Sequence, residues 1–246
     1  MNGKEEIFMN KILIISFLIL TATFVFGQEY EQKLYEFYVE GDMGKYGQLL
    51  RTMEKELDRS SNEGLFLLVQ TQFIYSSYLM EEDEDEAEKW IEKSWPMAES
   101  LKANKFKTAQ VLAMEGSMYG FMTSINPWKV MTYGPKSIEY LDKAIETNPN
   151  CPIAWLYYGN ADFYRPEIFG GSKTEALNKY KKAYSLLEER DVQKYDQWKV
   201  LNTLVMMGQA YEALDEPSLA KEYYQMALEI EPDFDWVKNT LLPELN

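Results

Sequence analysis

The sequence of 246 residues contains no histidine and a single cysteine, Cys151. The absence of histidine excludes serine–histidine and cysteine–histidine catalysis, histidine general bases and histidine-ligated zinc. One cysteine excludes an intramolecular disulfide, so packing alone must hold the fold. Cys151 stands at an expected helix start, a position that lowers the pKa of a thiol, but no histidine or second cysteine accompanies it. We therefore expect a protein that is not an enzyme and has no catalytic, cofactor or metal site.

Positive charge is also scarce. The chain has 25 Lys and Arg against 40 Asp and Glu, a formal net charge of −15, and residues 1–27 contribute none of it because Lys4 and Lys11 balance Glu5 and Glu6. We expect no nucleic-acid partner, because phosphate contacts need clustered Lys and Arg. The acidic run EEDEDE at residues 81–86 lacks the glycine and the spacing of an EF-hand calcium loop. We interpret it as a solvated helix start, where the helix dipole favours acids.

Long hydrophobic runs are limited to one segment near the N-terminus. Ile12 to Phe26 is apolar apart from one serine and two threonines, follows Lys11 and precedes Gly27. The run is short for a membrane span of about 20 residues, and its layout is typical of a secretory signal peptide. We predict a signal peptide over 1–27, with Met9 as an alternative start, and a mature chain over 28–246. An uncleaved anchor and a buried helix are the alternatives. The expected protein is exported, periplasmic or secreted, without stable membrane insertion after cleavage.

The remainder of the chain has helical periodicity and no strong strand signal. In the last third, Ala220, Tyr224 and Ala227 stand at i, i+4 and i+7, after Gly208 and before Pro232. Earlier copies of this small–large–small pattern become weaker toward the N-terminus: Ala176/Tyr180/Ala183 after Gly159, Ser137/Leu141/Ala144 after Gly116, Ala87/Ile91/Ser94, and Tyr46/Leu50/Met53 after Gly41. Small residues at this spacing let two helices touch. The unequal spacings between copies predict insertions at 123–134, 165–171 and 188–196.

Local signals mark where the helices begin and end. Pro152 and Pro217 predict helix starts with proline in the first turn, and Gly134-Pro135 predicts a third. Ser172 and Glu175 form a capping box. Arg165 precedes Pro166 and is disfavoured in a helix, so a helix must stop there.

The segment LVMMGQAYEALDEPSLAKEYYQMALEIEP at 204–232 resembles a tetratricopeptide repeat (TPR), with the repeat itself placed at about 201–234. The resemblance extends over about residues 30–234. The segment PKSIEYLDKAIETNPNCPIAW…FYRPEIFGGSKTEAL is similar to exported bacterial TPR proteins with a Gly-Gly loop, including the accessory TPR subunit of some TRAP transporters. The resemblance implies an all-α, right-handed helical-hairpin solenoid of about five irregular TPR-like pairs with a C-terminal capping helix at 234–245. It further implies a non-enzymatic scaffold that binds a protein or peptide, or an accessory ligand-binding or docking subunit of a solute transport system.

The candidate partner-binding residues fall into two groups. In TPR arrays the first helix of each pair lines a concave groove, which places Leu156, Asn160, Phe163, Tyr164, Gln209 and Glu212 on it. Alternatively, the superhelix closes on itself and these residues are core. The second group, Trp128 and Phe169, lies in loops that follow the first helices of adjacent pairs and should emerge on one edge. The alternative there is that the aromatic residues fill gaps between helices. Partner identity and oligomeric state remain open.

Overall fold

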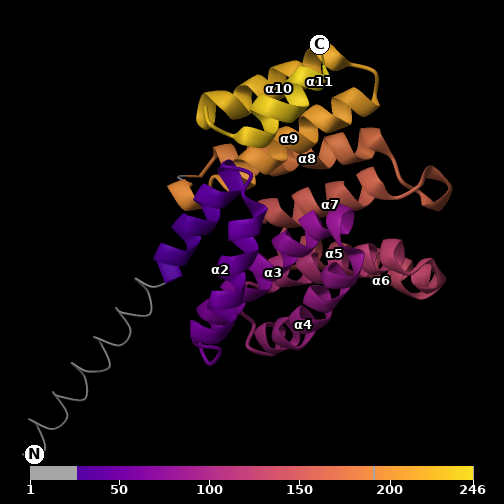
Figure 1. The fold of residues 1–246 in the computed structure, drawn as a ribbon. Helices are drawn as coiled ribbons and strands as arrows, with labels where there is room; N and C mark the ends of the chain where they lie inside the picture. Colours follow the sequence, from indigo (N-terminus) through magenta and orange to yellow (C-terminus); the bar gives the residue numbers. More distant parts are fainter. Residues whose placement is uncertain (1–26, 191, 246) are drawn as a thin grey trace, which may run out of the picture.

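The structure is a computed structural model that describes residues 27–190 and 192–245. The predicted signal peptide and the alternative start at Met9 lie outside the described residues, apart from Gly27. Helices and short turns make up the described part of the chain, which contains no strand. This confirms the predicted all-α class, and Figure 1 shows the helices stacked as successive hairpins.

Five helix pairs follow one another along the chain, as predicted. They are formed by residues 27–39 with α2 (Met43–Glu56), α3 (Asn62–Glu82) with α4 (Glu84–Ala103), α5 (Thr108–Ile125) with α6 (Val130–Thr147), α7 (Pro152–Tyr164) with α8 (Lys173–Glu188), and α9 (Trp198–Ala213) with α10 (Pro217–Ile230). Short 3-10 turns lie between some helices: η1 (Pro127–Lys129), η2 (Glu167–Phe169) and η3 (Lys194–Asp196). A π-helical turn, η4 (Val237–Leu241), and the short α11 (Leu242–Glu244) end the array.

The helix boundaries follow the local signals with one exception. Asp83 caps α4 by accepting a hydrogen bond from the backbone of Glu86 at 2.9 Å, and Ser172 caps α8 in the same way. The prediction of a helix start at Gly134-Pro135 is wrong. Helix α6 begins at Val130, where η1 runs directly into it, and it contains Pro135. The helix tolerates this proline because both Pro135 and Met131 are exposed. The carbonyl of Met131, which proline leaves without its helical donor, therefore lies at the surface rather than in the core.

Glycines mark the places where neighbouring helices touch. A Cβ added to Gly208 would lie 2.2 Å from the Tyr224 ring, and one added to Gly159 would lie 2.4 Å from the Tyr180 ring. Real Cβ atoms do not approach that closely, so these positions require glycine. The junction between α2 and α3 follows the same rule, since a Cβ at Gly47 would lie 2.5 Å from Tyr75. The weak first repeat thus has its close contact at Gly47, a residue that the sequence pattern missed.

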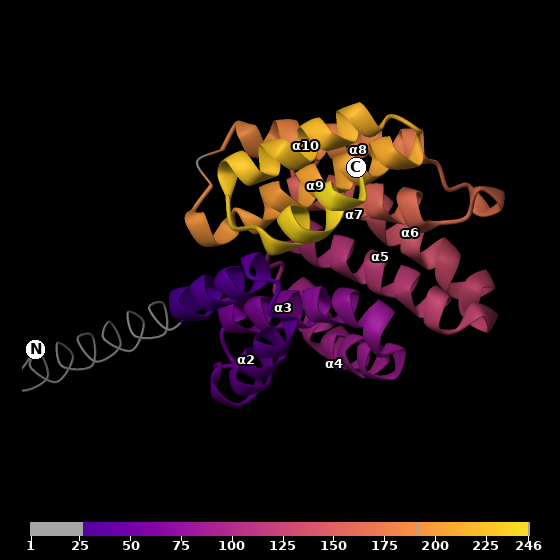
Figure 2. The same ribbon diagram turned by 45° about the horizontal axis from the view of Figure 1, so that its top comes forward.

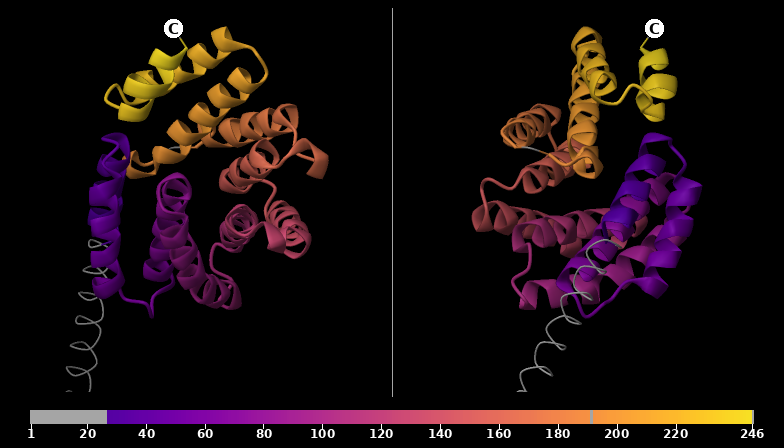
Figure 3. Two further views of the ribbon diagram at one scale, coloured as in Figure 1. Left: turned by 45° about the vertical axis from the view of Figure 1, so that its right-hand side comes forward. Right: turned by 90° about the vertical axis from the view of Figure 1, so that its left-hand side faces the viewer.

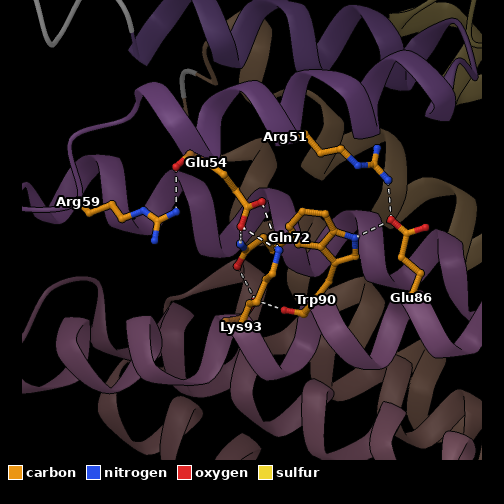
Figure 4. Close-up of polar contacts among 8 residues, drawn as sticks. Arg51, Glu54, Arg59, Gln72, Glu86, Trp90 and Lys93 are labelled. Carbon is orange, nitrogen blue, oxygen red and sulfur yellow. Dashed lines mark hydrogen bonds and ion pairs between the residues drawn. The ribbon is translucent and has the colours of Figure 1, made fainter.

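Polar contacts also fasten the first pair to the second (Figure 4). Arg51 of α2 pairs with Glu86 of α4 at 2.5 Å, and Glu86 also accepts a hydrogen bond from the Trp90 indole at 3.1 Å. Within the second pair, the hydroxyl of Ser94 on α4 donates to the side-chain oxygen of Gln72 on α3 at 2.8 Å, and both residues are fully buried. Each of these two buried groups therefore has the partner that burial demands.

The array curves until its first helix meets its last elements (Figure 3). The Tyr35 hydroxyl donates to Glu231, which follows α10, at 2.8 Å, and the ring of Tyr38 lies 5.2 Å from that of Phe234. Between residues 27–39, α3 and η3 remains a cavity of about 30 Å³, with Tyr38 and Asp196 among its lining residues. Side chains of the first helix, α3 and η3 line it and leave room for about two water molecules.

The helix contact predicts opposite effects of alanine at two helical glycines. Gly208→Ala should destabilise the fold by about 1–3 kcal/mol, because the new methyl group overlaps the buried Tyr224 ring. Gly120→Ala is the matched control. Gly120 lies inside α5, where an added Cβ would lie 3.5 Å from the Ser137 hydroxyl oxygen, an ordinary contact, and loss of glycine should stabilise that helix by about 0.5–1 kcal/mol. Urea unfolding midpoints measure both, and a Gly208→Ala variant as stable as wild type would contradict the packing described above.

Closure of the array predicts a difference between two neighbouring tyrosines. Tyr35→Phe removes the hydroxyl that bonds Glu231, and should destabilise the fold by about 1–2 kcal/mol. Tyr38→Phe should cost less, because the buried Tyr38 hydroxyl has no hydrogen-bond partner among the side chains and backbone of the described residues. Denaturant unfolding compares the two. Equal losses of stability in the two variants would mean that the Tyr35–Glu231 hydrogen bond does not hold the first helix in place.

Candidate functional site

The five most exposed large hydrophobic side chains of the described residues lie in two turns. Trp128 (94% exposed) and Met131 belong to the connection between α5 and α6, whereas Tyr164, Ile168 (86% exposed) and Phe169 belong to that between α7 and α8. We call these five residues the apolar edge. Large apolar side chains exposed together on one side of a folded protein are candidates for an interaction site.

The two turns project on the same side of the molecule, as Figures 1 and 2 show. The connection between α3 and α4 lies next to them, because Lys129 of η1 forms an ion pair with Glu88 of α4 at 3.6 Å. Although the Tyr164 side chain is 64% exposed overall, desolvation of its hydroxyl, and then the charge of Glu81 at the end of α3, raise the pKa of that hydroxyl. The ends of α3 and α7 are therefore within electrostatic range of each other. The predicted emergence of both loops on one edge agrees with this arrangement.

Ion pairs hold the turn between α7 and α8 in one conformation. The carboxylate of Asp162, which is 4% exposed, pairs with Arg165 at 2.6 Å and with Lys179 of α8. Arg165 also donates to the carbonyl of Gly170 at 3.1 Å, and the Asp162 carbonyl accepts from the backbone of Ser172 at 2.9 Å. The turn that displays Ile168 and Phe169 is thus tied to both helices from which it emerges.

The Gly-Gly sequence is needed for this tight turn. Gly170 has φ +86°, in the region that favours glycine, and a Cβ on Gly171 would lie 1.7 Å from the carbonyl oxygen of Arg165. Helix α7 ends at Tyr164 with Arg165 extended, as the following Pro166 predicts. The apolar side chains of this turn therefore stand on a rigid base, which lowers the entropy lost on binding.

The turn between α5 and α6 has a packed base and an exposed tip. The ring of Tyr133 lies 5.2 Å from that of Tyr119 on α5 and 6.4 Å from that of Trp95 on α4. Tyr133 therefore fills a gap between helices, as one reading of the sequence expected. Trp128 and Met131 do not, since both remain largely exposed.

The structure places the residues predicted to line a groove in different environments. Leu156 is fully buried in the core, and Phe163 is partly buried against it with the Lys173 ammonium 3.7 Å from its ring centre. Asn160 accepts from the Tyr180 hydroxyl at 3.0 Å, and Glu212 accepts from that of Tyr224. Gln209 is partly buried. Of this group only Tyr164 reaches the apolar edge, where it joins the two predicted loop residues Trp128 and Phe169.

Met131 and Ile168 lie in the two loops that were predicted as a candidate site, but they were not among the individual residues predicted to bind a partner. Both stand in the segments that the repeat spacing identified as insertions, so their position was available from the sequence. Their exposure could not be predicted from the sequence, because an apolar residue in an insertion can equally well be buried in the core.

Cys151 does not have the activated thiol that its position at a helix start suggests. It is 3% exposed, and burial raises the pKa of its thiol, outweighing the neighbouring backbone donors. Within residues 27–190 and 192–245, no group of three or more acidic or cysteine side chains is arranged to hold a metal. None of the helices in the same residues combines the length and the apolar character needed to cross a bilayer.

A buried acid, Glu115, lies between α4, α5 and α6. It is 1% exposed, and its carboxylate pairs with Lys102 of α4 at 2.8 Å. Burial raises the pKa of Glu115 to about 7, although the lysine acts in the opposite direction. Lys102 is shared with Glu99 at 2.9 Å, and the rings of Tyr119 and Tyr140 lie nearby. Because the site is packed and lies away from the apolar edge, we interpret Glu115 as structural.

The raised pKa predicts how stability depends on pH. An acid whose pKa is higher in the folded state binds more protons there, so stability falls as pH rises from about 4.5 to about 7. Glu115→Gln removes the titrating group and should stabilise the protein by about 1–3 kcal/mol at pH 8, with little effect at pH 5. Urea midpoints at both pH values provide the measurement. A destabilised variant at pH 8 would show that the ion pair with Lys102 outweighs the burial of its charge.

Comparisons with known proteins agree with the fold. Residues 201–234 match the family described as tetratricopeptide repeat, at the boundaries expected from the sequence. The structure resembles the HusA haemophore from Porphyromonas gingivalis, with 18% identity, a TM-score of 0.59 and coverage of 75% of this chain and 94% of HusA. It also resembles TTC0263, a thermophilic TPR protein of Thermus thermophilus, with 18% identity, a TM-score of 0.55 and coverage of 87% and 95%. A search of curated proteins gave no match. The chain thus contains a tetratricopeptide repeat at 201–234 within a TPR-like solenoid.

Proposed function

We propose that the protein is a non-enzymatic, exported scaffold that binds a protein or peptide partner on the apolar edge. The observation that carries this proposal is the exposure of Trp128, Met131, Ile168 and Phe169 on two adjacent turns. A helical solenoid offers a rigid frame for such turns. Closure of the array supports the choice of the edge, because the cavity between the first helix and α3 is too small for a peptide.

Export rests on the sequence before Gln28. Lys11, the apolar run and Gly27 favour a cleaved signal peptide, which places the mature chain in the periplasm or outside the cell. A docking role in a solute transport system is a narrower form of the same proposal, in which the partner is a solute-binding or membrane subunit.

The proposal is tested by crosslinking from single positions in cells that produce the full chain. A photoreactive phenylalanine analogue at Phe169 should give adducts with a specific partner. The same label at Glu146, which is exposed at the opposite end of α6, should give none. Ile168→Ser should reduce the adduct from position 169 by about tenfold, as loss of a buried apolar anchor does, while the thermal unfolding midpoint stays unchanged. The mass of the recovered chain shows whether it begins at Gln28.

Two results would contradict the proposal. Equal adducts from positions 169 and 146 would show random contact. Adducts that persist at full yield in Ile168→Ser would place the partner elsewhere on the surface.

A flat hydrophobic ligand is a second candidate for the same edge. Exposed Trp128, Tyr164 and Phe169 offer aromatic faces, and the fold resembles that of a haemophore over 75% of this chain. Titration of the mature chain with haem separates this candidate from the first. A saturable change in haem absorbance that is lost in Trp128→Ser supports this candidate. An absorbance change equal to that of haem added to buffer without protein excludes it.

A further inference from the structure

The two apolar turns lie between two acidic turns in the order of the array. The connection between α3 and α4 precedes them and exposes Glu81, Glu82, Glu84 and Asp85. The connection between α9 and α10 follows them and exposes Asp215 and Glu216. In a stack of helical hairpins, connections from first to second helices share one edge. The sequence of turns along this edge is therefore acidic, apolar, apolar, acidic.

The cations on this edge are already engaged within the chain. Arg165 and Lys179 both bind Asp162, and Lys129 binds Glu88. Lys173 donates to the carbonyl of Phe163, and Lys136 lies over the Tyr119 ring at 5.3 Å.

The acids of the α3–α4 turn are not engaged in this way. Within the described part of the chain, no cation forms an ion pair with Glu81, Glu82, Glu84 or Asp85. Like charges this close raise the local potential, and a net charge of −15 adds to it. The α3–α4 turn thus carries a local excess of exposed negative charge beside the apolar edge.

We propose, on the basis of the function proposed above, that the edge binds an extended segment with an apolar centre and Lys or Arg at both ends. The apolar residues of the segment contact Trp128, Ile168 and Phe169. Its cations meet the acids of the α3–α4 turn at one end and Asp215 and Glu216 at the other. Neighbouring turns are separated by two helix diameters, about 16–20 Å, so four turns span about 50 Å. An extended segment of about 15 residues covers that distance.

The probe is a set of three labelled peptides of equal length, tested against the mature full chain by fluorescence anisotropy. The first has an apolar centre of Leu and Phe with four Lys at each end. The second has Glu in place of every Lys. The third has the composition of the first, with the lysines in the centre and the apolar residues at the ends. The first peptide should bind at least about tenfold more tightly than either of the others, and this advantage should shrink at high salt.

Two quadruple variants test the role of the acids. Glu81→Gln, Glu82→Gln, Glu84→Gln and Asp85→Asn together should weaken binding of the first peptide about tenfold, since each exposed ion pair adds only a small attraction and four are removed at once. The matched control is Glu63→Gln, Glu146→Gln, Glu189→Gln and Glu229→Gln, which removes equal charge from exposed positions at the opposite helix ends and should leave binding within about twofold. Circular dichroism and thermal midpoints confirm that both variants are folded.

A triple variant, Trp128→Ser, Ile168→Ser and Phe169→Ser, separates this inference from the proposed function. Loss of binding in the triple variant, with no effect of the acidic variant, would overturn the basic segment and leave the apolar edge as the binding surface. Unchanged binding in both variants would overturn both proposals. Equal affinity for the three peptides, or binding of phosphatidylcholine vesicles in place of peptides, would overturn the basic segment as well.

Discussion

Contact between the first helix and the last elements of the array determines which surfaces remain free. Tyr35 reaches Glu231 across 196 positions of sequence, and Tyr38 packs on Phe234 beside it. An open solenoid would present the first helices of its pairs to a ligand. Here residues 27–39 lie across a small cavity from α3 and the start of α9, so part of that surface is covered by the chain itself. The connections between helices remain, and they carry the exposed apolar residues.

The contacts between glycine and large side chains explain how those connections are positioned. Because Gly159 meets Tyr180 and Gly116 meets Leu141 without an intervening Cβ, each pair of helices lies at close separation. Longer connections cannot enter such a tightly packed pair and must project from its end. The ion pairs of Asp162 then hold the projecting turn between α7 and α8 in one shape. Close packing and the exposed edge are thus two consequences of the same small residues.

The sequence predicted most of the architecture because helix contacts follow a local period. Ala220, Tyr224 and Ala227 are all fully buried, and their spacing alone indicated which face of α10 packs. The prediction failed at Gly134-Pro135, since a proline signals a helix start only when the preceding residues are not already helical. The site was harder to predict. Leu156 and Ile168 are both aliphatic, yet one is fully buried and the other is 86% exposed. That difference depends on closure of the array and on the shape of a turn, which involve residues distant in sequence.

The distribution of charge on the edge follows from which partner, if any, each charged side chain contacts. Cations near the apolar turns have structural partners, which for Arg165 and Lys129 are the carboxylates of Asp162 and Glu88. The acids outnumber those cations, so some acids remain without a counter-charge. Acids in the first turn of a helix are favoured by its dipole, and Glu84 and Asp85 stand there in α4. Excess negative charge therefore gathers at a helix start, and the hairpin architecture places that helix start beside the apolar edge.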